Sequence, residues 1–158
     1  MAKDRQVLVT QSVLDRLMDI QIQERDDWPR TTRESVEKFK RAVKRDLEWL
    51  LNTRQTLGPL LNNYPATQKS VFNYGLPDMT MVSMGSVDDR KRLTSYLETT
   101  VMLFEPRIEN LQISIELEDN SRRQIKFRFA GTLRMDPQPE EVSFDTLLEL
   151  TSGEYQVK

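Results

Sequence analysis

Apolar positions along the chain change their spacing once, at Pro106. Across residues 34–53 and 86–104 they recur every three or four positions, which is typical of helices with one buried face. Beyond Pro106 the period is two, and the alternating runs 111–117 and 125–133 indicate a hairpin. The pattern predicts an α+β fold in which N-terminal helices pack on a small C-terminal antiparallel sheet.

The limits of the domain follow from the same pattern. Residues 141–150 fit a third alternating strand, although two adjacent leucines also fit a helix. We therefore expect a sheet of about three strands within a single domain over residues 12–150. A flexible N-terminal segment at residues 1–11 and a C-terminal tail at residues 151–158 complete the chain. The exposed edges of such a sheet are templates for an added strand from another chain, which is a first indication of protein binding.

Composition excludes several function classes. The 158 residues include no cysteine and no histidine, so the usual metal ligands, thiol nucleophiles and imidazole bases are missing. The net charge is −2, and acids such as Asp46 alternate with the basic residues of 34–53, which favours a solvated helix face over nucleic-acid binding. No stretch approaches the ~20 apolar residues of a membrane span. We expect a cytoplasmic protein with no cofactor, no metal, no nucleic acid, no membrane insertion and no small-molecule substrate.

The joint between the helical and the alternating pattern carries two opposite charges. Pro106 ends the helix and turns Glu105 extended, because proline has no N–H to donate and restricts the residue before it. Glu105 and Arg107 then point to the same face, since side chains of an extended segment alternate. They either pair only with each other or share a partner, and Glu105, Pro106 and Arg107 are our candidate protein-interaction residues.

A second distinctive segment lies between the two helices. Gly75 allows a left-handed backbone angle, and Leu76 is held extended by Pro77. A single glycine does not form a phosphate-binding nest. We expect a structural loop with Tyr74 packed inward, formed by Asn73, Tyr74, Gly75, Leu76, Pro77 and Asp78.

Three segments in this order resemble the baseplate wedge family of contractile phage tails. They are DLEWLLNTR at 46–54, SVFNYGLPD at 70–78 and FEPRI at 104–108. Within the family the match is closest to the TssE branch, the baseplate subunits of bacterial type VI secretion systems, and it spans roughly residues 12–150. The resemblance implies a small α+β structural protein that contacts other wedge subunits and provides the platform where the contractile sheath begins. It also implies that Glu105, Pro106 and Arg107 lie in the region used for these contacts.

Two other functions stay open beside this one. Phage members of the family have been labelled lysozyme-like, but a muramidase needs two carboxyl groups, one of them held protonated. Arg107 next to Glu105 favours the ionised carboxylate, so we expect no catalytic residue and no peptidoglycan hydrolysis. A generic protein-binding adaptor that uses an exposed sheet edge is the other alternative, and the neighbouring genes discriminate it from a baseplate subunit.

Overall fold

The computed structural model of the chain describes residues 32–55, 64–77, 86–116, 124–135, 138–149 and 153–158. The expected flexible segment at residues 1–11 lies outside these residues, and so does Asp78 of the expected loop. The described elements are α2 (Thr32–Asn52), α3 (Pro65–Gln68), the 3-10 helix η2 (Val71–Asn73), α4 (Val87–Phe104), β1 (Ile108–Glu116), β2 (Gln124–Leu133), β3 (Glu140–Glu149) and β4 (Glu154–Val157).

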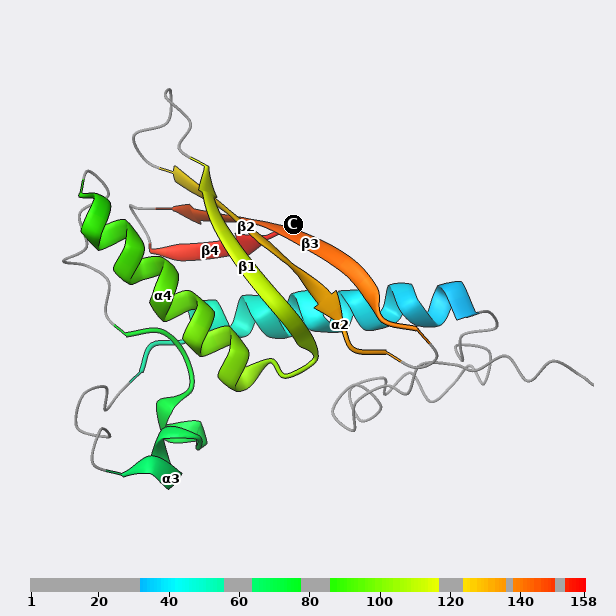
Figure 1. Cartoon of the computed structure of the whole chain (residues 1–158), viewed down its shortest axis with the longest axis horizontal. Coiled ribbons are helices and arrows are strands. Elements are labelled where there is room, and N and C mark those ends of the chain that lie inside the picture. The colour runs from blue at the N-terminus through cyan, green and yellow to red at the C-terminus, as the bar shows by residue number, and fades with distance from the viewer. Residues whose placement is uncertain (1–31, 56–63, 78–85, 117–123, 136–137, 150–152) are drawn as a thin grey trace, which may run out of the picture.

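Two layers make up the domain. The four strands form one antiparallel sheet in the order β1-β2-β3-β4, and the helices precede it in the chain (Figure 1). α4 packs against β1 and α2 packs against β4. The two long helices therefore cover the same face of the sheet, one near each edge. The α+β fold with N-terminal helices on a C-terminal antiparallel sheet is confirmed. No helix in the described part of the chain is long and apolar enough to cross a membrane.

The two long helices form where the apolar period predicts them. On α2 the buried side chains follow a three- and four-residue spacing, and on α4 Leu93, Leu97 and Val101 do the same. Ser86 caps α4, because its hydroxyl accepts a hydrogen bond from the Asp89 N–H at 3.3 Å. The buried apolar side chains of α2 are Phe39, Val43, Leu47, Leu50 and Leu51.

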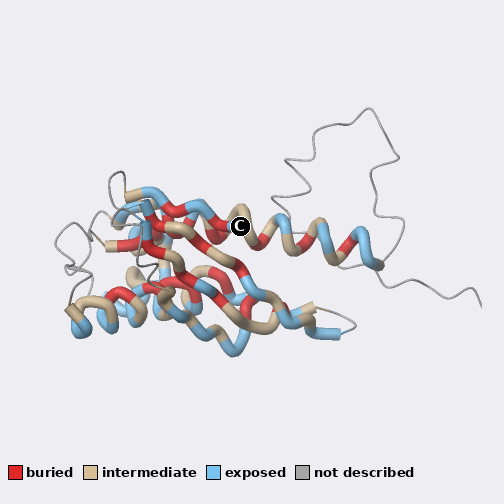
Figure 2. The backbone as a smooth tube through the Cα atoms, turned by 90° about the horizontal axis from the view of Figure 1, so that it is seen from above, coloured by how far each residue is buried: buried red, intermediate tan, exposed pale blue. Residues whose placement is uncertain are grey.

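Alternation along the strands separates an apolar face from a polar face, as the changes of colour along the tube show (Figure 2). The face toward the helices carries large apolar side chains that lie opposite one another in register, for example Phe129 opposite Phe144. Burial of these side chains on both layers is the main stabilising contribution to the fold. The buried members on β2, β3 and β4 are Ile125, Phe127, Phe129, Phe144, Leu148, Tyr155 and Val157.

The polar face carries a lattice of opposite charges. Arg128 lies 3.2 Å from Glu116 and 2.9 Å from Asp145, and Lys126 also reaches both carboxylates, at 3.1 and 3.5 Å. The hydrogen bond from Arg128 holds the pKa of Asp145 below its ordinary value. Neighbouring strands therefore present paired charges to water on this face, which keeps it hydrated.

The sheet has four strands rather than about three. Residues 140–149 form a strand and not a helix, and β4 lies within the segment expected to be a tail. β4 is held from outside the sheet, because the Asn52 amide donates to the Tyr155 carbonyl and accepts from the Tyr155 N–H, both at 2.8 Å. A four-residue strand gives a weak local signal, and its partner side chain comes from the end of α2.

In the described part of the chain, two buried hydroxyl groups lack a hydrogen-bond partner. They belong to Thr146 and Tyr155, which are 0% and 2% exposed. Burial raises the pKa of Tyr155 to about 12. An unsatisfied buried hydroxyl costs free energy, so each of these positions is a site where an apolar replacement is tolerated.

We expect Thr146→Val to stabilise the fold by about 1 kcal/mol, because valine keeps the branched shape and removes the unpaired hydroxyl. Urea unfolding followed by circular dichroism measures this change. Thr94→Val is the matched control, since the Thr94 hydroxyl donates to the Arg90 carbonyl at 3.0 Å. An equal or larger gain in the control would contradict the explanation.

Candidate protein-interaction site

The joint between α4 and β1 turns the chain within three residues. The Glu105 N–H donates to the Val101 carbonyl at 2.8 Å and closes the last turn of the helix. The Glu105 carbonyl then accepts from the N–H of Ile108, the first residue of β1, at 3.1 Å. Pro106, exposed at the turn, ends the helix as predicted. Glu105 and Arg107 are thereby fixed at a corner between a helix and a strand.

Arg107 joins three elements through its guanidinium group. Its Nε and Nη2 atoms donate to the two carboxylate oxygens of Glu105. The same Nη2 donates to Oδ2 of Asp46, on α2, at 2.7 Å. The guanidinium also lies over the ring of Phe39, 5.7 Å from its centroid. The corner between α4 and β1 is therefore tied to α2 by charge as well as by apolar packing.

The charges at this corner balance one another. Arg45 lies 2.8 Å from the second Asp46 oxygen, so two cations meet two carboxylates. We call Arg45, Asp46, Glu105 and Arg107 the charge cluster. Glu105 is only 3% exposed. Burial acts to lower the pKa of Arg107, but its hydrogen bonds to Glu105 and Asp46 and their negative charges raise it overall, so the guanidinium stays charged.

The structure answers one question that the sequence left open. Glu105 and Arg107 do pair with each other, and they share Asp46 as a third member. The role of Asp46 was missed, because its place among the alternating charges of the helix pattern favoured a solvated position. The signal that pointed to it was its position at the start of the first segment that resembles the wedge family.

The loop between the helices lies against the same corner. Tyr74 packs edge-on against Phe104 with ring centroids 5.3 Å apart. Burial, and then the charges of Asp46 and Glu105, raise the pKa of Tyr74. Gly75 has a φ of +105°, and the Gln55 amide holds the loop by donating to the carbonyls of Asn73 and Gly75 at 3.1 and 2.9 Å.

Two exposed side chains mark the outer surface of the cluster. Trp49 lies one turn beyond Arg45 on α2 and is 46% exposed, with the Arg45 guanidinium 4.9 Å above its ring. Pro106 is exposed at the turn beside Arg107. Trp and Arg are among the residue types that contribute most of the binding energy in protein interfaces. This arrangement suits binding of another protein.

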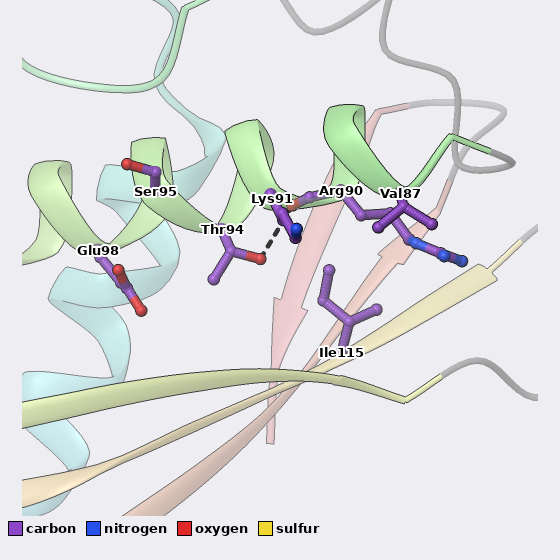
Figure 3. Close-up of a pocket in the computed structure, with 7 residues that line it drawn as sticks. All are labelled: Val87, Arg90, Lys91, Thr94, Ser95, Glu98 and Ile115. Carbon is purple, nitrogen blue, oxygen red and sulfur yellow. Dashed lines mark hydrogen bonds between the residues drawn. The ribbon is translucent and has the colours of Figure 1, made fainter.

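A separate groove lies between α4 and β1 and encloses about 390 Å³ (Figure 3). Its described lining residues include one carboxylate, on Glu98, and the cations of Arg90 and Lys91 lie nearer the start of α4. A glycosidase needs two carboxyl groups across its cleft, and the described lining offers one. The remaining lining residues are Val87, Thr94, Ser95 and Ile115.

Comparison with known protein families gives one match. The family of baseplate wedge protein gp25 matches residues 37–138. The matched range includes all four residues of the charge cluster, the loop around Gly75, and strands β1 and β2. No curated protein matches the chain.

Proposed function

Because the chain belongs to the family of baseplate wedge protein gp25, we propose that it is a structural subunit of the baseplate of a bacterial type VI secretion system. In this role it contacts other wedge subunits in the cytoplasm and helps the contractile sheath to begin assembly. Family membership supports a structural part in a phage-tail-like baseplate, and the resemblance of its three sequence segments to the TssE branch supports the secretion system.

The observation that carries the proposed contact is the surface of the charge cluster. Its charges are already neutralised within the chain, so Trp49 and Pro106 meet a partner without an unpaired ion beside them. The cluster also ties α2 to the α4–β1 corner, which keeps this surface rigid. A preorganised surface loses little conformational entropy when it binds. Glu105 and Arg107 thus support the contact by shaping it.

One sheet edge supports the second part of the proposal, the start of the sheath. β1 pairs with β2 on one side only, so its other side carries an unpaired row of backbone groups among the described strands. At the opposite edge, Asn52 of α2 bonds the N–H and the carbonyl of Tyr155 on β4. An open edge such as that of β1 accepts an extended segment of another chain. The charged face of the sheet stays in water, so assembly is expected at the β1 edge and not on this face.

Trp49→Ala tests the wedge contact. In cells that express the tagged chain with the wedge subunits encoded beside its gene, we expect the wild type to copurify with them. We expect Trp49→Ala to weaken binding at least tenfold, since buried aromatic anchors commonly contribute 2 kcal/mol or more. Biolayer interferometry with the purified wedge subunits measures the affinity, and counts of fluorescent sheaths in cells should fall in parallel.

Tyr96→Ala is the matched control, because Tyr96 is 51% exposed on the outer side of α4. The melting temperatures of both variants should stay near that of the wild type. Equal affinity of Trp49→Ala and wild type for the wedge subunits would contradict the proposed surface. A wild-type chain that binds none of them, or whose gene lies away from sheath and tube genes, would favour a generic adaptor.

A further inference from the structure

The segment that holds α3 and η2 has an inner and an outer side. On the inner side, Leu76 is fully buried and Tyr74 packs on Phe104. On the outer side, Val71 and Phe72 are 80% and 63% exposed. Tyr64, at the start of the segment, is 62% exposed. These are three of the seven large apolar side chains that are exposed in the described part of the chain. We call Tyr64, Val71 and Phe72 the apolar anchor.

Hydrogen bonds within the segment hold the anchor in place. The Ser70 hydroxyl donates to the Thr67 carbonyl at 2.6 Å and accepts from the Phe72 N–H at 3.4 Å. The Asn73 amide donates to the Gln68 carbonyl at 2.9 Å. The backbone under the anchor is therefore ordered before any partner arrives, and exposed apolar side chains on an ordered backbone are typical of interfaces.

The anchor stands apart from the two layers of the domain. α3 and η2 contact each other and lie on the far side of α2 and α4 from the sheet, at the lower left of the view in Figure 1. Tyr74 links the anchor to the rest of the chain, because its ring lies on Phe104 immediately before Glu105, and the Gln55 amide donates to the carbonyls of Asn73 and Gly75. The segment that carries the anchor thus packs against the corner that holds the charge cluster.

We propose that the apolar anchor inserts into an apolar socket on the same wedge subunit that contacts the charge cluster. This inference rests on the proposed function. Lys69 is the one charged residue between positions 64 and 77. The complementary socket is therefore lined by apolar side chains and carries a carboxylate at its rim, opposite Lys69. An anionic lipid surface or a nucleic acid would call for several cations here, and the segment offers one.

A second copy of the chain fits the anchor less well. In a two-fold dimer the same patch meets itself. Each Lys69 would then face residues 64–77 of the other copy, a stretch that carries another lysine and no carboxylate. Like charges placed together across an interface oppose association. The charge pattern thus favours a different protein as the occupant.

The test uses the full chain and the purified wedge subunits encoded beside its gene. We expect Val71→Ser/Phe72→Ser to bind them about 100-fold or more weakly than the wild type, since two buried apolar side chains each contribute a factor of about ten or more. Its melting temperature should stay near the wild-type value, because both side chains are exposed. Met102→Ser, 66% exposed on α4, is the matched control. A photo-crosslinking amino acid at position 72 should form its crosslink on an apolar surface of one wedge subunit.

Several results would overturn the inference. Wild-type affinity of the double variant together with loss of affinity in Trp49→Ala would leave the proposed function standing and remove the anchor from it. A crosslink between two copies of the chain, or binding of vesicles with anionic lipid that the double variant loses, would name a different occupant. Absence of any binding by the wild type would overturn the proposed function, and the anchor's socket with it.

Discussion

Arg107→Ala is expected to lower the free energy of unfolding by about 3 to 5 kcal/mol. The substitution removes the cation that neutralises Glu105, whose side chain is only 5% exposed, and leaves a buried carboxylate without a charged partner. It also releases Asp46 from the corner of α4 and β1. Guanidinium unfolding of the purified variant, followed by circular dichroism, measures the loss. Arg128→Ala on the hydrated sheet face is the control, and its unfolding midpoint should change little.

A double variant ties this loss to the buried charge. Glu105→Gln combined with Arg107→Ala should recover part of the stability, because the uncompensated charge is gone. If the double variant is as unstable as Arg107→Ala, then Arg107 contributes to stability through packing alone.

This expectation changes what a defect in assembly would mean. The sequence allowed Arg107 to act mainly on a partner, and its truncation would then have spared the fold. With Glu105 buried beneath it, loss of sheaths in Arg107→Ala cells is expected from instability alone. Substitutions at Trp49, which is exposed, separate binding from folding more cleanly.

Gly75→Ala is the second large expected effect, a loss of about 3 kcal/mol or more. Gly75 has a φ of +105°, and a Cβ at this position would lie 2.4 Å from the Thr53 carbonyl oxygen. That oxygen is fixed, since it accepts a hydrogen bond from the Leu76 N–H at 2.8 Å. The clash therefore has to separate the loop from the end of α2. Thermal unfolding by calorimetry is the measurement.

Gly153→Ala provides a matched control at another positive φ, +71°. A Cβ there meets the end of the Arg54 side chain at 2.9 Å, which can move aside. We expect a loss of about 1 kcal/mol, the cost of a left-handed angle for alanine. Similar losses at the two glycines would show that backbone angle alone decides both, and that contact with Thr53 contributes nothing.

Much of the fold was predictable because its signals are local. The stripe on α2, the stop at Pro106 and the alternation in β1 and β2 each arise within one segment of chain, and each predicts the element that forms. The segment 141–150 fitted either a strand or a helix, and its described part belongs to β3 because β3 pairs along its whole length with β2, which the local pattern does not reveal.

The candidate site was predictable only in part, for the same reason. The pairing of Glu105 with Arg107 follows from period two, whereas Asp46 reaches them from 61 residues away. The position of Asp46 beside Arg107 depends on how α2 crosses the end of α4. That crossing is set by side-chain packing and cannot be read from the spacing of residues in the sequence. The outward direction of Val71 and Phe72 was likewise hidden, because neither residue differs in type from one that packs inward.

The two hydrogen bonds between the Asn52 amide and the Tyr155 backbone have a consequence for synthesis of the protein. The two residues are 103 positions apart, so α2 is complete on the ribosome long before the strand that it docks against exists. At about 5 to 20 residues per second, that interval is roughly 5 to 20 seconds. During that interval, the apolar side of α2 lacks the strand that it packs against in the complete fold. The nascent chain is most vulnerable to aggregation in that interval, and docking of α2 is the step that ends it.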